Sequence, residues 1–592
     1  MIAPNFSELT SGCVEQACRS SLFDLPSELI IEVLRNVDHC TILRCCSVCH
    51  RLKHIIDDAL ELQYIIELAL DGMVDGPPST LSPGERLLLL RRRRRAWHFL
   101  EWSKQHIVPM PGSCQAYELV GGVFAKTAST DFIVAGSRHF MATWLPSTGT
   151  GVAAGDEGPR TLTRDDIGIT TRDFAIDPSQ DLIVFVKSDE LNFGMPDTLT
   201  LVLRAISTNE PHPEARLPTL TCSVQFPLNS AFIQIVDDVV GMLFYSEFER
   251  GPRIVIWNWH DGSILVDRSH YDLPHLTWDF SFLSSRAYII TCAAGPGSIE
   301  IFTFDAPNPS RVPVHVAKLQ LPPLQPRVQV VGVTAHTGPF VARVPAGVPF
   351  APNNDERLHV VSMQYRTQPQ DMPGSMPRFC VVFKNSLPME YIRKYREEKL
   401  QECATVLWHS WGPMKTRFLP QLAPFQWLRY VHGMRWVVPI LPVAERGHRV
   451  QVLDFNVRNT RRQDFFATSS ASGDGESGSR SAPAYSSHVA PASPSDCGSP
   501  SSCHGPPAMS PSELDNGVRS AGGARVTVHT NVDRVAESIF VTPVVSFLPY
   551  RLAEPTGMGP YSGVMIDEER LIGLEHPAFS NGDMKHIHVF TM

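Results

Sequence analysis

The stretch LPSELIIEVL, residues 25–34, sets the character of the N-terminal part of this 592-residue chain. Pro26 has a fixed φ angle that suits the start of a helix, and Glu28 places a negative charge in the first helical turn. Apolar residues such as Leu29 and Val33 recur at helical spacing. The stretch therefore predicts a short helix that begins sharply.

The helical pattern continues beyond this stretch as far as Leu70. Turn-forming residues at 71–78 then interrupt it. Ser82 is expected to cap a further helix, because a proline follows it and Glu85 stands three positions on. We therefore expect residues 85–104 to be helical.

A second apolar segment, CTILRCCSVCHRL at residues 40–52, follows the opening stretch. Together the two segments resemble the F-box, whose pattern is Leu-Pro-x-Glu-Leu, an apolar pair and a later Val-Cys-x-x-Leu. Three short helices cannot bury all of these apolar side chains among themselves, so part of the surface is expected to await a partner's helix. The resemblance covers about residues 22–60, and residues 61–102 look like the helices that follow the box in many fungal F-box proteins.

In the F-box family, this surplus surface binds the Skp-type linker of a cullin-RING ubiquitin ligase, and the rest of the protein selects a substrate. The resemblance implies an SCF-type substrate-recognition adaptor for an unknown protein substrate, with catalysis supplied in trans. It implies eight contacts with the linker: Leu25, Pro26, Leu29, Ile30, Val33, Leu34, Leu43 and Val48. The alternative is a small helical cap whose leucines all point into its own core.

From about residue 115 the sequence changes to short β-branched and aromatic runs bounded by turn-forming residues. A coarse repeat is clearest in residues 233–267 and 277–305. Further copies are expected at residues 117–144, 172–186, 328–383, 427–455 and 541–590. Such units predict a WD-like β-propeller of about seven blades, because only a neighbouring blade can cover the apolar face of each blade. An irregular β-sandwich or two β-domains is the alternative.

The expected fold class is therefore α+β multidomain, with a helical F-box before an all-β region. The expected boundaries are a flexible N-terminus at 1–21, F-box helices at 22–60, a helical linker at 61–110 and a propeller-like substrate-recognition region at 111–592. Residues 468–523 are rich in Ser, Ala, Gly and Pro, which predicts a disordered insertion. Its Ser-Pro pairs at Ser493, Ser499 and Ser510 are either phosphorylation sites or ordinary low-complexity sequence.

Two cofactor patterns occur inside the predicted box. Residues 46–50, CSVCH, match the haem-attachment pattern, and Cys40, Cys45, His39 and His50 lie near enough in sequence to suggest zinc. The chain shows no export signal and no second ligand pair at zinc-finger spacing. We therefore expect core cysteines, with no metal and no cofactor.

Five consecutive arginines, Arg91–Arg95, could form a nuclear-import or phosphate-binding patch. Because they surround the helix, we favour solvation or pairing with acids such as Glu85 and Glu101. Trp97 and Trp102 are expected to dock this helix against the β-region.

Composition limits the remaining classes of function. The net charge of −9 gives no drive toward phosphate backbones, and no apolar run approaches the length of a membrane span, so we expect neither nucleic acid nor membrane as a partner. The 13 cysteines are scattered, which favours reduced thiols and a cytoplasmic or nuclear protein. No common catalytic motif occurs, so a non-catalytic adaptor is expected. A non-degradative scaffold, and a β-propeller ligand-binding protein or hydrolase, are the alternatives.

Overall fold

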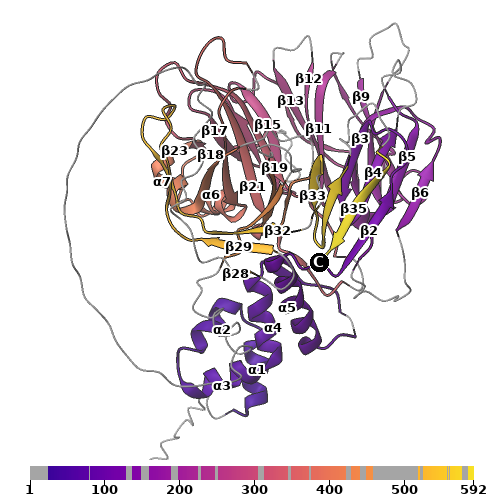
Figure 1. Ribbon diagram of the computed structural model, residues 1–592. Helices are drawn as coiled ribbons and strands as arrows, with labels where there is room; N and C mark the ends of the chain where they lie inside the picture. Colours follow the sequence, from indigo (N-terminus) through magenta and orange to yellow (C-terminus); the bar gives the residue numbers. More distant parts are fainter. Residues whose placement is uncertain are drawn as a thin grey trace, which may run out of the picture.

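The computed structural model combines an N-terminal helical module with a β-propeller (Figure 1). It describes residues 25–78, 80–128, 136–147, 159–188, 198–224, 228–246, 251–304, 312–344, 348–372, 375–421, 429–440, 449–457, 518–519, 524–556, 558, 561–575 and 584–592. The N-terminus at 1–21 lies outside these residues. So does the insertion predicted at 468–523, apart from Val518–Arg519.

The helical module consists of α1 (Ser27–Leu34), α2 (His39–Cys45), α3 (His50–Asp58), α4 (Leu60–Leu70) and α5 (Pro83–Phe99). Local sequence sets where these helices begin. The Ser82 hydroxyl accepts a hydrogen bond from the Glu85 N–H, and the Glu85 carboxylate accepts one from the Ser82 N–H at 2.7 Å. The capping box predicted from the sequence is therefore confirmed.

Within the described residues, seven sheets form the blades of the propeller. Blade 1 contains β3 (Ala116–Val120), β4 (Val123–Ala128), β5 (His139–Trp144) and β6 (Arg160–Arg164); blade 2 contains β7 (Thr171–Asp177), β8 (Leu182–Lys187), β9 (Thr198–Ala205) and β10 (Thr219–Ser223). Blade 3 contains β11 (Leu228–Val236), β12 (Val239–Ser246), β13 (Pro252–Asn258) and β14 (Ile264–Arg268). Blade 4 contains β15 (Thr277–Ser284), β16 (Ala287–Cys292), β17 (Ser298–Thr303) and β18 (Val314–Gln320), with β23 (Ala404–Val406) added in parallel.

Blade 5 contains β19 (Gln329–Thr337), β21 (Leu358–Arg366), β22 (Arg378–Lys384) and β24 (Thr416–Pro420), and α6 (Ser386–Arg396) and α7 (Trp408–Lys415) lie between its last two strands in sequence. Blade 6 contains β25 (Val431–His432), β26 (Arg435–Ile440), β27 (Arg449–Asp454) and β32 (Tyr550–Pro555), extended by β29 (Ala524–His529) and β28 (Val518–Arg519). Blade 7 contains β33 (Gly563–Ile566), β34 (Arg570–Leu574), β35 (His586–Thr591) and β2 (Lys104–Pro109). Two short sheets pair β1 (Met73–Asp75) with β20 (Phe350–Pro352) and β30 (Asp533–Val535) with β31 (Val544–Ser546); η2 (Pro178–Gln180) and η3 (Asn354–Glu356) are single 3₁₀ turns.

Both faces of a blade are buried, as the strand β13 illustrates. Its residues Val255 and Trp257 pack in the core shared with blade 2, whereas Ile254 and Ile256 pack in the core shared with blade 4. Successive side chains of a strand point to opposite faces, so a continuous apolar run is needed where both faces are covered. The propeller expected from the repeats, with about seven blades, is confirmed.

The ring closes through a strand from the other end of the chain. β2 pairs antiparallel with β35, with Val108 opposite Ile587, and becomes the outer strand of blade 7. The structure changes two of the expected boundaries. The range 61–110, expected as helical linker, contains a propeller strand, and residues 541–590, expected as one unit, are divided between blades 6 and 7.

The helical module is attached firmly to the propeller. β1 forms its two-stranded sheet with β20, and the Arg86 guanidinium donates to the Pro349 carbonyl oxygen at 3.2 Å. Trp97 is 1% exposed in the apolar core that α5 shares with blades 6 and 7, and the ring of Trp102 meets Phe590 edge-on at 5.1 Å. The prediction that these tryptophans dock α5 against the β-region is confirmed.

The arginine run belongs largely to this structural framework. Arg93 forms an ion pair with Glu568 of the propeller, Arg94 pairs with Asp71 and Glu67 inside the module, and Arg95 pairs with Glu101 at 3.1 Å. Burial by itself would raise the pKa of Glu568, but Arg93 and His432 outweigh it and lower this pKa to about 2. Glu85, which we expected to pair with the run, is instead used by the capping box.

Candidate functional site

One side of α1 is apolar and open to solvent. Leu29 and Val33 are 51% and 48% exposed, and their spacing of four residues places them one above the other on the helix surface. Val48, between α2 and α3, is 64% exposed. We call Leu29, Val33 and Val48 the exposed apolar set. The Arg51 guanidinium donates to the Leu25 carbonyl oxygen at 3.0 Å, which holds the start of α3 beside the start of α1.

The other residues of the predicted interface occupy different positions. Ile30 and Leu34 are 0% and 3% exposed and fill the core of the helical module, so they are not available on its surface. Leu25 and Leu43 are half-buried against that core, and Pro26 is exposed at the start of α1. The helical period is consistent with this division, because residues 30 and 34 lie about 100° around the helix axis from residues 29 and 33.

The cysteines of the box contribute to packing and capping. Cys45, Cys46 and Cys49 are half-buried against the core of the module, and the Cys49 sulfur accepts a hydrogen bond from the N–H of Leu52 at the start of α3. The expectation of core cysteines holds for these three residues. Cys40 is exposed.

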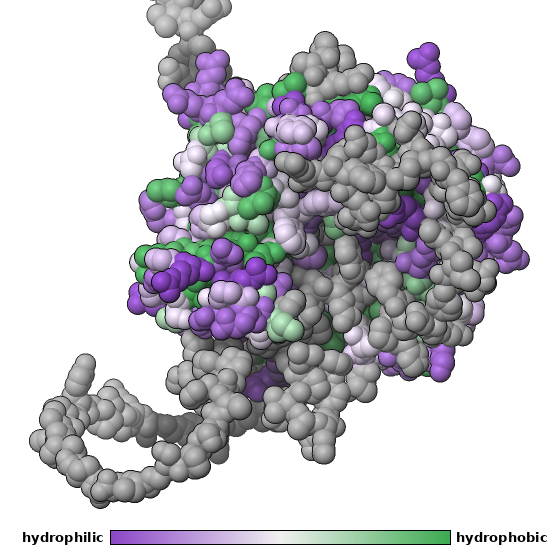
Figure 2. Space-filling view, turned by 90° about the horizontal axis from the view of Figure 1, so that it is seen from above, coloured by the Kyte–Doolittle hydropathy of each residue, from purple (hydrophilic) through white to green (hydrophobic). Residues whose placement is uncertain are grey.

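A second candidate site is a cavity of about 1640 Å³ that runs along the inner strands of the propeller. It extends from the loop at residues 270–276, which precedes β15, to Phe340, which follows β19. The helical module contacts the propeller through Glu568, which follows the inner strand β33, and through β20, which follows the inner strand β19. It therefore lies on the face where the inner strands end. The loop at 270–276 precedes the inner strand β15, so it lies on the opposite face. Figure 2 looks onto that opposite face.

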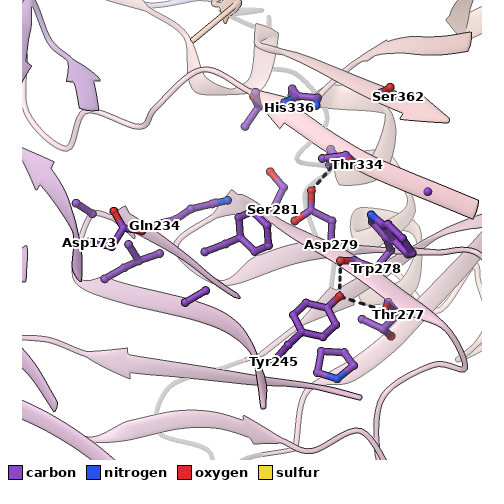
Figure 3. Close-up of a pocket in the computed structure, with 18 of the residues that line it drawn as sticks. Asp173, Gln234, Tyr245, Thr277, Trp278, Asp279, Ser281, Thr334, His336 and Ser362 are labelled. Carbon is purple, nitrogen blue, oxygen red and sulfur yellow. Dashed lines mark hydrogen bonds between the residues drawn. The ribbon is translucent and has the colours of Figure 1, made fainter. Parts of the chain in front are cut away.

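Two carboxyl groups in the wall of the cavity have shifted pKa values. Burial raises the pKa of Asp279 to about 7, although its carboxylate accepts hydrogen bonds from the N–H groups of Ala335 at 2.9 Å and Phe280 at 2.7 Å. Burial likewise raises the pKa of Asp173 to about 7, against the opposing effect of the Phe174 N–H. Each group changes charge near neutral pH. Figure 3 shows both carboxyl groups among the side chains that line the cavity.

Two further polar groups of the cavity, Arg429 and His336, keep one charge state near pH 7. Arg429 pairs with Glu118 at 2.5 Å; burial lowers the pKa of Arg429, but Glu118 outweighs burial and raises it above its usual value. Burial lowers the pKa of His336 to about 4, so this side chain is neutral at pH 7. The wall therefore offers hydrogen-bonding groups and an ion pair rather than a strong field of one sign.

The outer end of the cavity is aromatic and apolar. Trp278 is 42% exposed, and its backbone is held by the Tyr245 hydroxyl, which donates to the Trp278 carbonyl oxygen at 2.6 Å (Figure 3). Leu276 is 53% exposed. A half-exposed tryptophan and a half-exposed leucine beside a deep cavity form a surface suited to binding a partner.

Sequence reasoning did not identify this cavity as a site. The pair Trp278-Asp279 marked a repeat, but a propeller cavity is lined by residues from many blades. The available signal was a large aromatic residue and an acid at the start of an inner strand.

The folded arrangement defines a class of protein in which a small helical docking module is fixed to a β-propeller. Comparison with protein families finds the F-box domain at residues 22–62. The chain therefore contains an F-box domain at residues 22–62, with a seven-bladed β-propeller C-terminal to it. This is the general architecture of F-box substrate-recognition adaptors, which are typically non-catalytic, and F-box domains bind Skp-type linkers in SCF complexes.

No curated protein sequence matches the chain. Among solved structures, a functionally unknown protein from Desulfotomaculum acetoxidans is 8% identical with a TM-score of 0.28, and the match covers 58% of this chain and 81% of that one. The WD40 domain of SCAP from fission yeast is 10% identical with a TM-score of 0.28, covering 59% and 86%. Oligopeptidase B from Leishmania major is 8% identical with a TM-score of 0.26, covering 63% and 51%. At these values the similarities carry no conclusion about function.

No helix in the described part of the chain is long and apolar enough to cross a membrane.

Proposed function

We propose that this chain is the substrate-recognition subunit of an SCF-type cullin-RING ubiquitin ligase. In this proposal the helical module binds a Skp-type linker, and the propeller holds a protein target within reach of a ubiquitin-charged enzyme. The observation that carries the proposal is the exposure of Leu29 and Val33 in α1, while Ile30 and Leu34 beside them fill the core.

The linker would cover the exposed apolar set first. Fully burying an exposed Leu or Val side chain contributes about 1.5–3 kcal/mol. Because these three side chains are only 48–64% exposed, covering the rest of each contributes roughly half of that value, which is still a useful part of a specific interface. We place Leu25, Pro26 and Leu43 at its margin, since Leu25 and Leu43 are half-buried and Pro26 is exposed. In this proposal Ile30 and Leu34 support α1 from behind instead of touching the linker.

The cavity and its aromatic rim are the proposed site for the target. The rim residues Trp278 and Leu276 lie on the face opposite the helical module, so a target bound there would not compete with the linker for space. Because catalysis is supplied by other subunits, the function of this chain would be to hold the target at high local concentration.

Linker binding is tested by co-purification of the full chain with a Skp-type linker. We expect Leu29→Asp/Val33→Asp to abolish recovery, because two charges would be placed in an apolar interface. The matched control is Leu88→Asp, which changes a 50% exposed leucine on α5. Equal recovery of linker by the double variant and the wild type, with melting temperatures (Tm) unchanged, would contradict the proposal.

The rival functions predict different results in the same system. A non-degradative scaffold would bind the linker without assembling cullin or supporting ubiquitin transfer to a bound target. A β-propeller ligand-binding protein or hydrolase would bind a small molecule regardless of the linker. Co-purification of cullin and ubiquitin transfer to the bound target separate the scaffold from the ligase subunit. Proximity labelling with the proteasome inhibited, comparing wild type with Trp278→Ala, tests the small-molecule alternative, because a propeller that binds only small molecules predicts no loss of specific labelled proteins.

A further inference from the structure

A cluster of three metal-binding side chains lies on blade 7, away from both sites described above. Glu575 directly follows β34, and His586 and His588 are two residues apart on β35. Residues two apart on a strand point to the same face, so the two imidazoles stand side by side. Their ring centroids are 5.3 Å apart.

The three side chains converge on one point. Glu575 Oε2 lies 2.9 Å from His586 Nε2, and Glu575 Oε1 lies 2.9 Å from His588 Nε2. All three ligand atoms lie within 4.8 Å of one another. Zinc bonds of about 2.0–2.1 Å in a tetrahedron place ligand atoms about 3.4 Å apart, so a small outward movement would admit a cation.

We propose that Glu575, His586 and His588 bind a divalent transition cation of the zinc class. Two imidazoles and one carboxylate are a ligand set that suits zinc and its neighbours rather than calcium or magnesium. With three protein ligands, at least one further position is left for water. The side chains of Glu575 and His586 are 39% and 30% exposed, so a cation can reach the site from solvent.

The surroundings of the cluster fit a cation site. The Nδ1 atom of His588 has no hydrogen-bond partner among the described residues, so the ring can carry its proton there and free Nε2 for the metal. Ile107 and Pro109 of β2 stand opposite His588 and His586 on the same face, and the Tyr561 ring lies 5.3 Å from that of His588. These groups surround the ligands with apolar and aromatic surface.

The position of the cluster suggests what the cation does for the fold. β35 carries both histidines and also pairs with β2, the strand that closes the ring. A cation bound by all three side chains would link the end of β34 to β35 and so stabilise blade 7 where β2 closes the ring. Because the cation binds the folded chain, it raises the stability of that state by mass action.

The test uses untagged full-length protein freed of metal with a chelator. Zn²⁺ or Co²⁺ is titrated in competition with a chromogenic chelator, and Tm is measured with and without Zn²⁺. Loss of a residue that only hydrogen-bonds to a metal ligand weakens metal affinity about 10–100-fold. Glu575 and His586 are ligands themselves in this proposal, so we expect Glu575→Gln and His586→Asn each to weaken metal affinity at least about tenfold. Both residues are partly exposed, and Glu575→Gln nearly keeps the shape of the side chain.

Two controls separate this cluster from other metal-binding groups. His409→Asn changes an exposed histidine on α7. Asp38, His39 and Cys40 form the other group of possible metal ligands in the described residues, and Cys40→Ser removes the thiol from that group. We expect one tightly bound cation per chain, unchanged in both controls, and a cobalt spectrum without a thiolate band. Wild-type binding no tighter than that of Glu575→Gln, or binding lost only in Cys40→Ser, would overturn the proposal.

Discussion

Leu29 and Ile30 are neighbours in α1, yet one is half exposed and the other is completely buried. We predict that Ile30→Ala lowers the free energy of unfolding of the helical module by about 2–5 kcal/mol, because it leaves a cavity in a packed core. Leu29→Ala should change stability little and weaken linker binding instead. Urea unfolding of the full chain measures the first effect and linker titration measures the second. The reverse pattern would show that the two side chains had been assigned to the wrong faces.

The sequence identified the right segment but could not say which side of α1 faces outward. Residues 29–31 and 33–34 are all apolar, so the helical period alone fits more than one orientation. The orientation depends on Ile42, Leu52 and Ile56, which come from other helices and pack against Ile30 and Leu34. Such contacts between helices are set by tertiary packing.

Asp173 makes stability depend on pH. Its folded-state pKa is raised to about 7 from an ordinary value near 4, so the folded chain binds the proton more tightly than the unfolded chain does. This contribution to stability is present at low pH and is lost as the pH rises from about 4 to about 7. We predict that Asp173→Asn has a higher Tm than wild type at pH 8 and a smaller advantage at pH 5. An advantage that does not change with pH would contradict the assignment.

At the scale of elements, β2 shows why closure of the ring escaped sequence analysis. It is a six-residue strand that directly follows the helices, and its partner β35 lies at the far end of the chain. No hairpin turn marks the pairing, so local pattern could not detect it. The blades made of consecutive strands, such as β11 to β14, were predicted well because adjacent strands pair through short turns.

The role of β2 gives a prediction about fragments. A fragment of residues 103–592 keeps the outer strand of blade 7, whereas one of residues 111–592 removes it and exposes the edge of β35. We expect the shorter fragment to have a lower Tm and to aggregate more readily in differential scanning fluorimetry and size-exclusion chromatography. Equal Tm values would mean that β2 does not contribute to closure.

At the scale of the whole molecule, the junction between the helical module and the propeller determines how the two proposed binding sites are oriented. Trp97 in a shared core, the Arg93–Glu568 pair and the β1–β20 sheet all cross this junction. The sequence predicted docking by the tryptophans. It could not predict the β1–β20 sheet, since three-residue strands without a nearby partner carry no recognisable pattern.

Gly76 is tightly packed at this junction. A Cβ atom there would lie 2.1 Å from the Val348 carbonyl oxygen and 2.8 Å from the Pro349 carbonyl carbon. We predict that Gly76→Ala costs about 1–3 kcal/mol and loosens the module, which limited proteolysis and Tm would detect. The control is Gly332→Ala, where the nearest atom, in Trp278, would be 3.5 Å away. If the two variants resist protease equally, the junction tolerates more movement than this packing implies.

The central claim is that the exposed side of α1 is a binding surface for a Skp-type linker. Hydrogen exchange of the full chain, measured with and without purified linker, tests it most directly. We predict new protection in α1 (Ser27–Leu34) and around Val48, with no change in the inner strands that line the cavity. Complex formation without added protection in α1, or no complex at all, would contradict the claim.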